Sequence, residues 1–310
     1  MYPNDNIHFI RKNEKCILSQ HVRSHLLLLI HRFFSSKGFI LVDPPILHEQ
    51  IPNKKYEVYV PLYGGKYSLN SSNALYMGAY ASLFGRVYAI SSTFRDELCS
   101  GNHLLEFRML EVEILDMTFK DLPQFIENFI LFILQELTTS KIIQENRSLA
   151  KRIDKLLGSF PLNFMSYENF IHYINQSSQN KLEYGVDISS VDFEITKLLK
   201  KPVFIIDYPM ALASWTAKSK SSLQAYALNL LLPDTYGELC EGCERNNDIA
   251  QLRYKLKCAN ISCLQWYLDA IEKVKVSRCG FGIGIDRLVR WIVGLNSIQD
   301  SILFPRIKQL

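Results

Sequence analysis

The residues best suited to chemistry in this chain lie between positions 92 and 114, which read STFRDELCSGNHLLEFRMLEVEI. Arg95 and Glu97 come just before a polar break that contains a glycine, and the chain then returns in an alternating run. The alternating residues of that run are Phe107, Met109, Glu111 and Glu113. Since alternate residues of a strand share a face, we expect Arg95 and Glu97 to point the same way, and a cation, acids and an aromatic ring to meet on one side of a hairpin. A solvated strand pair with cross-strand ion pairs is the alternative interpretation.

A second candidate site is the glycine-containing segment near the end of the chain, GFGIGIDRLVRWIVGL. Gly280, Gly282 and Gly284 alternate in an apolar strand that runs directly into a helix. Glycine leaves space where another surface must come close, so this strand suits the floor of a site for a flat ligand. Arg287, at the start of the helix, has the chemistry to pair with a phosphate or to stack on a ring. A Rossmann dinucleotide turn does not fit, because the motif closes the chain and no alternation of strands and helices surrounds it.

The chain has seven cysteines, an odd number, in a pattern unlike that of a small disulfide-stapled domain. Cys240, Cys243, Cys258 and Cys263 have a spacing that resembles a four-thiolate zinc site. Residues 252–273 are expected to be helical, however, which would spread these ligands apart. Ordinary reduced cysteines are therefore favoured over zinc, and the sequence leaves open whether Cys240 and Cys243 form a redox pair.

The elements that must position these residues follow from hydrophobic periodicity. Residues 17–36 have apolar positions at helical spacing and end before Gly38, a typical helix stop. Residues 119–200 carry amphipathic helical patterns and are predicted to form a helical connection packed on a sheet. The other predicted elements are helices at 74–84, 121–137, 146–157 and 190–200, and strands within 39–42, 56–70, 86–94, 106–117, 202–208 and 223–232.

Composition indicates a globular chain: 310 residues that are 48% hydrophobic can bury a substantial core. The formal net charge of +4 permits weak attraction to polyanions, but the basic residues are scattered, so charge alone does not indicate nucleic-acid binding. The N-terminal residues are polar and do not resemble a secretory signal, and the longest apolar run, LLLLIHRFF, is too short to span a membrane. We therefore expect a cytoplasmic protein without a membrane partner.

Taken together, these blocks resemble the catalytic core of class II aminoacyl-tRNA synthetases, in particular the aspartyl and asparaginyl branch. TFRDE followed by HLLEFRMLEVE looks like the branch's arginine-to-glutamate pair, loop and returning strand, and GFGIGIDRL with the later ILFPR is similar to its terminal block. GFILVDPPIL, after a long helix, looks like its dimer-forming motif. The segments between these blocks also match in order: NFMSYENFI, YGVDI, KPVFIIDYP and LLLPDTYGEL.

The resemblance implies an α+β fold, the class II synthetase core, with a mostly antiparallel sheet flanked by helices. It implies a single catalytic domain over residues 1–310 and a homodimer formed through the 17–45 region. ATP and Mg²⁺ are the implied cofactors. Attack of a carboxylate on phosphorus brings two anions together, so positioning and charge neutralisation, rather than a protein nucleophile, would supply the catalysis.

The block from TFRDE to HLLEFRMLEVE carries most of the nucleotide contacts that the resemblance implies. Arg95 would hold the α-phosphate and the substrate carboxylate, and Glu97 would read the adenine amino group. His103 would approach the phosphate tail, and Phe107 would stack on adenine. A plain loop histidine and a core aromatic are the alternatives for His103 and Phe107.

The terminal block supplies the rest of the implied ATP site. Arg287 would stack on the second face of the adenine and touch the γ-phosphate, above Gly282 and Gly284. Glu238 would lie near Mg²⁺. Arg95 and Arg287 are the implied catalytic residues.

Substrate choice is expected to depend on Arg245, seven residues after Glu238. In the resembling branch, an arginine at this spacing receives the side-chain carboxylate or carbonyl of the amino acid, and a guanidinium fork fits a carboxylate by two contacts. Glu111 matches an acid that would receive the α-ammonium group. Ala74 and Met77 stand where the branch has a glutamine and the aspartyl lysine, which leaves room in the pocket. A surface cation is the alternative for Arg245.

The chain also departs from the pattern. The first of these blocks begins near the start of the sequence, so we expect this core to lack the oligonucleotide-binding barrel that precedes it in the tRNA enzymes. Asn229 stands where the family commonly has a metal-binding aspartate, and Asn102 replaces a loop arginine. A neutral amide holds magnesium less strongly than a carboxylate does. Cys240, Glu241 and Cys243 occupy a stretch usually built of glycine and serine.

The function that this pattern predicts is ATP-dependent activation of an aspartate- or asparagine-like amino acid to an aminoacyl adenylate, with release of pyrophosphate. Ammonia or another small amine is the expected acceptor, as in archaeal-type asparagine synthetases, which have a similar truncated layout. Aminoacylation of tRNA by an asparaginyl-type enzyme is one alternative. A non-catalytic paralogue that binds nucleotide, tRNA or a partner protein is the other.

Overall fold

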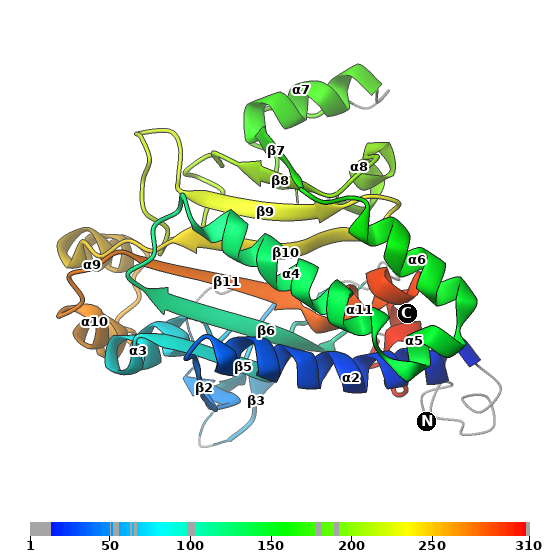
Figure 1. The fold of residues 1–310 in the computed structure, drawn as a ribbon. Coiled ribbons are helices and arrows are strands. Elements are labelled where there is room, and N and C mark those ends of the chain that lie inside the picture. The colour runs from blue at the N-terminus through cyan, green and yellow to red at the C-terminus, as the bar shows by residue number, and fades with distance from the viewer. Residues whose placement is uncertain are drawn as a thin grey trace.

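One eight-stranded sheet carries Phe107, Glu111, Glu238 and the alternating glycines, and helices cover one of its faces (Figure 1). The structure is a computed structural model that describes residues 14–49, 51, 56–62, 64, 67–97, 103–177, 181–188 and 192–307. Asn102 lies outside these residues. The strands, in their order across the sheet, are β1 (Ile40–Leu41), β5 (Arg86–Phe94), β6 (Glu106–Leu115), β11 (Arg278–Gly284), β10 (Gly237–Glu244), β9 (Ala227–Leu232), β8 (Val203–Ile206) and β7 (Asn163–Ser166).

The sheet is mostly antiparallel, which confirms the predicted fold class. Only the pairs at its two edges, β1 with β5 and β7 with β8, are parallel. A smaller antiparallel sheet is formed by β2 (Leu47–Glu49), β4 (Tyr67–Leu69) and β3 (Tyr59–Val60). The predicted hairpin is present, because β5 and β6 pair along their whole length from Arg86 opposite Ile114 to Phe94 opposite Glu106.

The helices pack as a layer on one face of the large sheet. The four that form this layer are α2 (Glu14–Ser36), α4 (Leu122–Thr138), α6 (Arg147–Leu157) and α11 (Ile285–Val293). Phe33 of α2 meets Phe129 of α4 with ring centroids 5.1 Å apart. Below them, Leu110, Val112 and Ile114 of β6 are buried. Because side chains alternate along a strand, the intervening residues of β6 face the opposite side of the sheet. Within the described ranges, no helix is long and apolar enough to cross a membrane.

The connection between β6 and β8 is helical for most of its length, but it also extends the sheet. Its helices are α4, α5 (Lys141–Glu145), α6, α7 (Tyr167–Ser177), α8 (Asp192–Ile195) and the 3₁₀ helix η3 (Thr196–Leu198). Strand β7 lies within it and pairs with β8 at the sheet edge. The helix expected at 190–200 is shorter than predicted, since only α8 and η3 form there in the described part.

The remaining predictions need two corrections. Strand β5 ends at Phe94, so Arg95 and Glu97 lie beyond the strand and do not share a strand face. The Arg95 amide still donates to the Leu105 carbonyl oxygen at 3.0 Å, whereas the Asp96 amide donates to the Tyr56 carbonyl oxygen at 3.0 Å. Residues 252–273 form two helices, α9 (Ile249–Cys258) and α10 (Gln265–Ile271). Asn260, with φ of 55°, adopts the left-handed conformation that ends a helix. Helix α3 (Ala74–Phe84) and the 3₁₀ helix η4 (Ile298–Ser301) complete the fold.

Candidate active site

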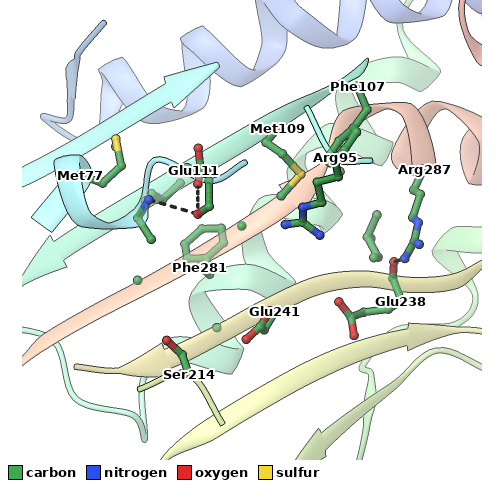
Figure 2. Close-up of a pocket in the computed structure, with 18 of the residues that line it drawn as sticks. Met77, Arg95, Phe107, Met109, Glu111, Ser214, Glu238, Glu241, Phe281 and Arg287 are labelled. Carbon is green, nitrogen blue, oxygen red and sulfur yellow. Dashed lines mark hydrogen bonds between the residues drawn. The ribbon is translucent and has the colours of Figure 1, made fainter. Parts of the chain in front are cut away.

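A cavity of about 700 Å³ lies over β6, β11 and β10, on the face of the sheet away from the helical layer. It is called the central cavity below. Every residue that the sequence placed in the site lines it: Ala74, Met77, Arg95, Glu97, His103, Phe107, Glu111, Glu238, Arg245, Gly282, Gly284 and Arg287. The structure therefore brings the two sequence blocks together in one site, and Figure 2 shows part of it.

The register of the strands sets the order of side chains on the cavity floor. Gly282 of β11 pairs with Glu111 of β6 on one side and with Glu241 of β10 on the other. Asn229 of β9 pairs in turn with Glu241. An irregularity in β10 just after Glu238 shifts the alternation, so Glu238 and Glu241 both line the cavity. A glycine thus separates acidic side chains on two different strands.

One end of the cavity gathers basic groups and an aromatic ring. Arg95 Nη1 lies 3.7 Å from Glu97 Oε1, and His103 Nε2 lies 3.7 Å from Glu97 Oε2. Arg95 Nε also donates to the Ser71 carbonyl oxygen at 3.2 Å. The Arg95 guanidinium carbon lies 5.5 Å from the centroid of the Phe107 ring, within cation–π distance. A cation beside an aromatic face suits a ligand that joins an anion to a flat ring.

Arg287 closes this end from the other side. Its Nη1 donates to the Glu238 carbonyl oxygen, and its guanidinium carbon lies 5.1 Å from the Phe193 ring centroid. Phe193, in α8, also contacts Arg290, at 5.8 Å, and the edge of His103, at 5.6 Å between ring centroids. Sequence reasoning missed Phe193, because nothing in the connection indicated which of its side chains would reach the site.

Glu111 is held by the start of α3. Its Oε1 accepts from the Ser72 hydroxyl at 2.9 Å and from the Asn73 amide at 2.8 Å, and its Oε2 accepts from Asn73 Nδ2 at 2.9 Å. Burial raises the pKa of Glu111, while these hydrogen bonds and the charge of Arg95 act in the opposite direction. Glu111 is a fixed acceptor at the cavity wall, so the interpretation as a solvated strand pair is wrong.

Arg245 lies at the other end of the cavity, against Glu113. Its Nη2 is 3.1 Å from Glu113 Oε2, and its side chain is only 10% exposed. Arg278 approaches the same carboxylate, with Nη1 3.3 Å from Oε1, and both of those side chains are fully buried. Burial by itself lowers the pKa of Arg245, but Cys243 and Glu113 raise it well above its usual value. Arg245 is therefore a buried, permanently charged group, and the surface-cation alternative is wrong.

Gly280 makes the Glu113 and Arg245 pair possible. A Cβ atom at this position would lie 1.9 Å from Glu113 Oε2 and 2.2 Å from Arg245 Nη2. Such distances are far below van der Waals contact, so any larger residue would displace the ion pair. The glycine strand expected to accommodate a flat ligand also accommodates two charged side chains.

Small and apolar groups complete this end of the cavity. Ala74 and Met77 of α3 both line the cavity, and Ser214 lies across from Met77 (Figure 2). Arg245 Nη1 is 3.3 Å from the Thr216 hydroxyl and 3.1 Å from Cys243 Sγ. The pocket around the guanidinium thus has a hydroxyl and a thiol as well as a carboxylate.

The zinc alternative does not fit the structure. Cys240 packs in the core beneath the helical layer, whereas Cys243 lines the cavity on the opposite face of β10. Both are reduced and buried, Cys258 is exposed, and burial raises the pKa of the Cys240 and Cys243 thiols. Across the described ranges, no three side chains of the metal-ligating types are grouped to hold a metal ion. Thiols on opposite faces of one strand do not form a redox pair with each other.

The fold and the site define a synthetase core, and comparison with known proteins agrees. The family described as "tRNA synthetases class II (D, K and N)" matches residues 4–308, so the chain belongs to this family. It is a ligase, and the chemistry of its catalytic domain is of the aminoacylation type.

Solved structures place the chain near the asparaginyl and aspartyl branch. It is similar to the asparaginyl-tRNA synthetase of Pyrococcus horikoshii complexed with asparaginyl-adenylate, with 26% identity, a TM-score of 0.84, and coverage of 94% of this chain and 69% of that one. The Entamoeba histolytica asparaginyl-tRNA synthetase shares the fold at 22% identity and a TM-score of 0.87, over 97% of this chain and 70% of that one. A putative aspartyl-tRNA synthetase from Leishmania major Friedlin shares it at 19% identity and a TM-score of 0.77, over 95% and 66%.

Proposed function

We propose that this chain activates an aspartate- or asparagine-like amino acid with ATP, releases pyrophosphate, and transfers the aminoacyl group to ammonia or another small amine. The observation that carries the first half is that the central cavity has basic and aromatic groups at one end and a buried guanidinium at the other. The adenylate complex of the P. horikoshii relative supports the same chemistry.

Arg95 and Arg287 would bind the nucleotide. Formation of an adenylate requires a carboxylate to approach the α-phosphorus, and fixed cations on either side of the cavity screen this repulsion. Phe107 offers a ring face for adenine, and Glu97, between Arg95 and His103, offers acceptors for its amino group. Gly282 and Gly284 leave the space beneath the base open.

Arg245 and Glu111 would bind the amino acid. Glu111 presents a buried carboxylate to the α-ammonium group, while Arg245 presents its guanidinium to the side-chain carboxylate or carbonyl. Glu113 already neutralises part of the positive charge of Arg245 and Arg278. This end of the cavity is therefore compatible with a substrate side chain that ends in a neutral carbonyl and with one that ends in a carboxylate. Ala74 and Met77 would limit the length of the amino-acid side chain that fits in the cavity.

Mg²⁺ fits Glu238 and its surroundings. Asn229 Nδ2 donates to Glu238 Oε2, so a side-chain amide lies beside the Glu238 carboxylate, which lines the cavity. Magnesium prefers oxygen ligands and commonly uses one or two carboxylates together with substrate phosphates. When bound, the ion would neutralise phosphate charge; Glu238 would hold it, and Asn229 would orient Glu238.

The proposal of a small acceptor rests on cavity residues that differ from those of the resembling branch. Glu241 and Cys243 line it in a stretch where the resemblance leads us to expect glycine and serine. A carboxylate and a thiol at these positions change the charge and the shape of the path by which an acceptor would reach the adenylate. The P. horikoshii likeness instead favours a second candidate, asparaginyl-tRNA synthesis. Asn229, in place of a metal-binding acid, favours the third, a non-catalytic nucleotide-binding paralogue.

The test has two stages. Amino-acid-dependent exchange of pyrophosphate into ATP, measured with each of the standard amino acids, detects activation; we expect aspartate or asparagine to give the signal. AMP formation is then measured with ammonium, other amines and tRNA as acceptors. Turnover that needs tRNA would replace the small-acceptor proposal with tRNA aminoacylation, and ATP binding without any exchange would favour the paralogue.

We also propose that residues 1–310 act as one catalytic domain and that two copies associate through the 17–45 region. Exposed apolar side chains support the dimer, because Leu28 on α2 is 66% exposed and Leu41 on β1 is 52% exposed. Light scattering tests this assembly. The parent chain should have the mass of a dimer, and Leu28→Glu should have the mass of a monomer. A monomeric mass for the parent chain would refute the proposal.

A further inference from the structure

Glu241 differs from most of the other acids that line the central cavity. Five of those acids have a hydrogen bond or an ion pair in the structure: Glu97, Glu111, Glu113, Glu238 and Asp286. The Glu241 carboxylate has no hydrogen-bond or ion-pair partner among the described residues, and the side chain is exposed to the cavity. An ionised carboxylate in such a position is ready to bind a cation.

The position of Glu241 relates it to the expected reaction centre. Its cross-strand neighbour on β11 is Gly282, and beyond Gly282 lies Glu111 on β6. Two strand spacings amount to roughly 10 Å between backbones, and the glycine puts no side chain between the two acids. Figure 2 shows Glu241 between Glu238 and Ser214, on the side of the cavity across from Arg95. An amino acid held by Glu111 and Arg95 would therefore present its carboxyl carbon toward Glu241.

The surroundings of Glu241 favour a positively charged ligand. Burial raises the pKa of Tyr208 well above its usual value, and the charges of Glu238 and Glu241 raise it further. Glu241 also raises the pKa of Cys243, after burial, while Arg245 opposes that effect. Glu241 therefore adds negative charge to this stretch of β10.

We propose that Glu241 is the acceptor site: it binds the amine in its ammonium form and removes the proton that would otherwise block attack. This assignment rests on the proposed function. Glu111 and Glu241 then hold two different nitrogen groups, the α-ammonium of the amino acid and the ammonium of the acceptor, on either side of Gly282.

Transfer from the adenylate to the amine conserves atoms and charge. One proton passes from the ammonium ion to the Glu241 carboxylate, and the resulting amine lone pair forms a C–N bond to the carbonyl carbon of the adenylate. The bond from that carbon to the phosphate oxygen breaks, AMP leaves with the electron pair, and the nitrogen loses a second proton to solvent. The products are the amide, AMP and two protons, one of them on Glu241, and no oxidant or metal redox step is needed.

Glu241→Gln tests the assignment, because it keeps the shape of the side chain but removes its charge and basicity. With the amino acid found by exchange, single-turnover transfer from the preformed adenylate is measured with ammonium and with hydroxylamine, which is mostly unprotonated near neutral pH. We expect transfer to ammonium to fall about 10²-fold or more and transfer to hydroxylamine to fall far less. The exchange rate of the same variant measures activation separately and shows that it is folded.

Glu145→Gln serves as the matched control, since the Glu145 side chain is 66% exposed on α5 and does not line the cavity. It should alter neither exchange nor transfer. If Glu241→Gln lowers exchange as much as transfer, or lowers transfer equally with both amines, Glu241 acts in activation or metal binding and the assignment is wrong. Exchange in the parent chain with transfer only to tRNA would refute the small acceptor and this assignment together. No exchange at all would instead refute the proposed function.

Discussion

Arg245 is bound to Glu113 inside the central cavity, with Nη2 3.1 Å from Oε2. Arg278 approaches the second carboxylate oxygen from the other side at 3.3 Å. One negative charge between two guanidinium groups leaves the cluster with a net positive charge in a buried place. A ligand that brings an acidic or carbonyl oxygen to Arg245 would offset this positive charge, which is a physical reason for an aspartate- or asparagine-like substrate.

Replacing Gly280 should disrupt this cluster. In Gly280→Ala the new Cβ would overlap both Glu113 and Arg245, so we expect a loss of about 1–3 kcal/mol in the free energy of unfolding. Gly284→Ala is the matched control, because its Cβ would meet nothing closer than 3.7 Å, and it should change stability by less than about 0.5 kcal/mol. Urea unfolding measures both. Equal stability of the two variants would contradict the close packing described for Gly280.

The raised pKa of Glu111 predicts a pH dependence of amino-acid binding. The carboxylate must be ionised to attract an ammonium group, so affinity is lost as pH falls through the pKa of Glu111. Since burial raises that pKa, the loss should begin at a higher pH than for an ordinary glutamate. The measurement is the KM for the amino acid in pyrophosphate exchange as a function of pH. Glu111→Gln should give a high KM without this acidic limb, and a flat parent profile would count against the role of Glu111.

Phe193 should support Arg287 in nucleotide binding. Its ring lies 5.1 Å from the guanidinium carbon, a contact worth about 0.5–1 kcal/mol, so Phe193→Leu is expected to raise the KM for ATP by about 2–5-fold. The KM for the amino acid should stay unchanged. Phe164→Leu, at a ring that is 51% exposed on β7, is the control. An unchanged KM for ATP in Phe193→Leu would show that the contact does not position Arg287.

Local patterns were sufficient to predict the parts of the site that lie on regular elements. The alternation in 106–117 predicted which side chains of β6 share a face, and Met109, Glu111 and Glu113 all line the cavity. The alternating glycines likewise predicted an open floor. The ordered resemblance then joined the two blocks, which strand periodicity alone does not do. The roles of the individual residues remain predictions.

Features that depend on distant packing were not predictable from the sequence. Phe193 reaches Arg287 because a connection of helices folds back over the sheet, and no local pattern encodes that approach. The burial of Arg278 beside Glu113 likewise depends on strand register rather than on the residue type, since arginine is usually exposed. The path of the chain just after β5 also depends on a distant contact, because the Asp96 amide donates to the Tyr56 carbonyl oxygen.

Asn229→Asp should make the stability of the protein depend on divalent metal. Asn229 now donates a hydrogen bond to Glu238, and an aspartate would place a second carboxylate there instead. Without metal, we expect a loss of about 1–3 kcal/mol in the free energy of unfolding, because a buried hydrogen bond is replaced by repulsion. Added Mg²⁺ should reverse this loss, and Mn²⁺ affinity, measured by electron paramagnetic resonance, should rise roughly tenfold. Asn146→Asp, at the N-cap of α6, makes the same exchange away from the cavity and should show neither effect. If Mg²⁺ stabilises Asn229→Asp no more than the parent chain, Glu238 is not the magnesium site.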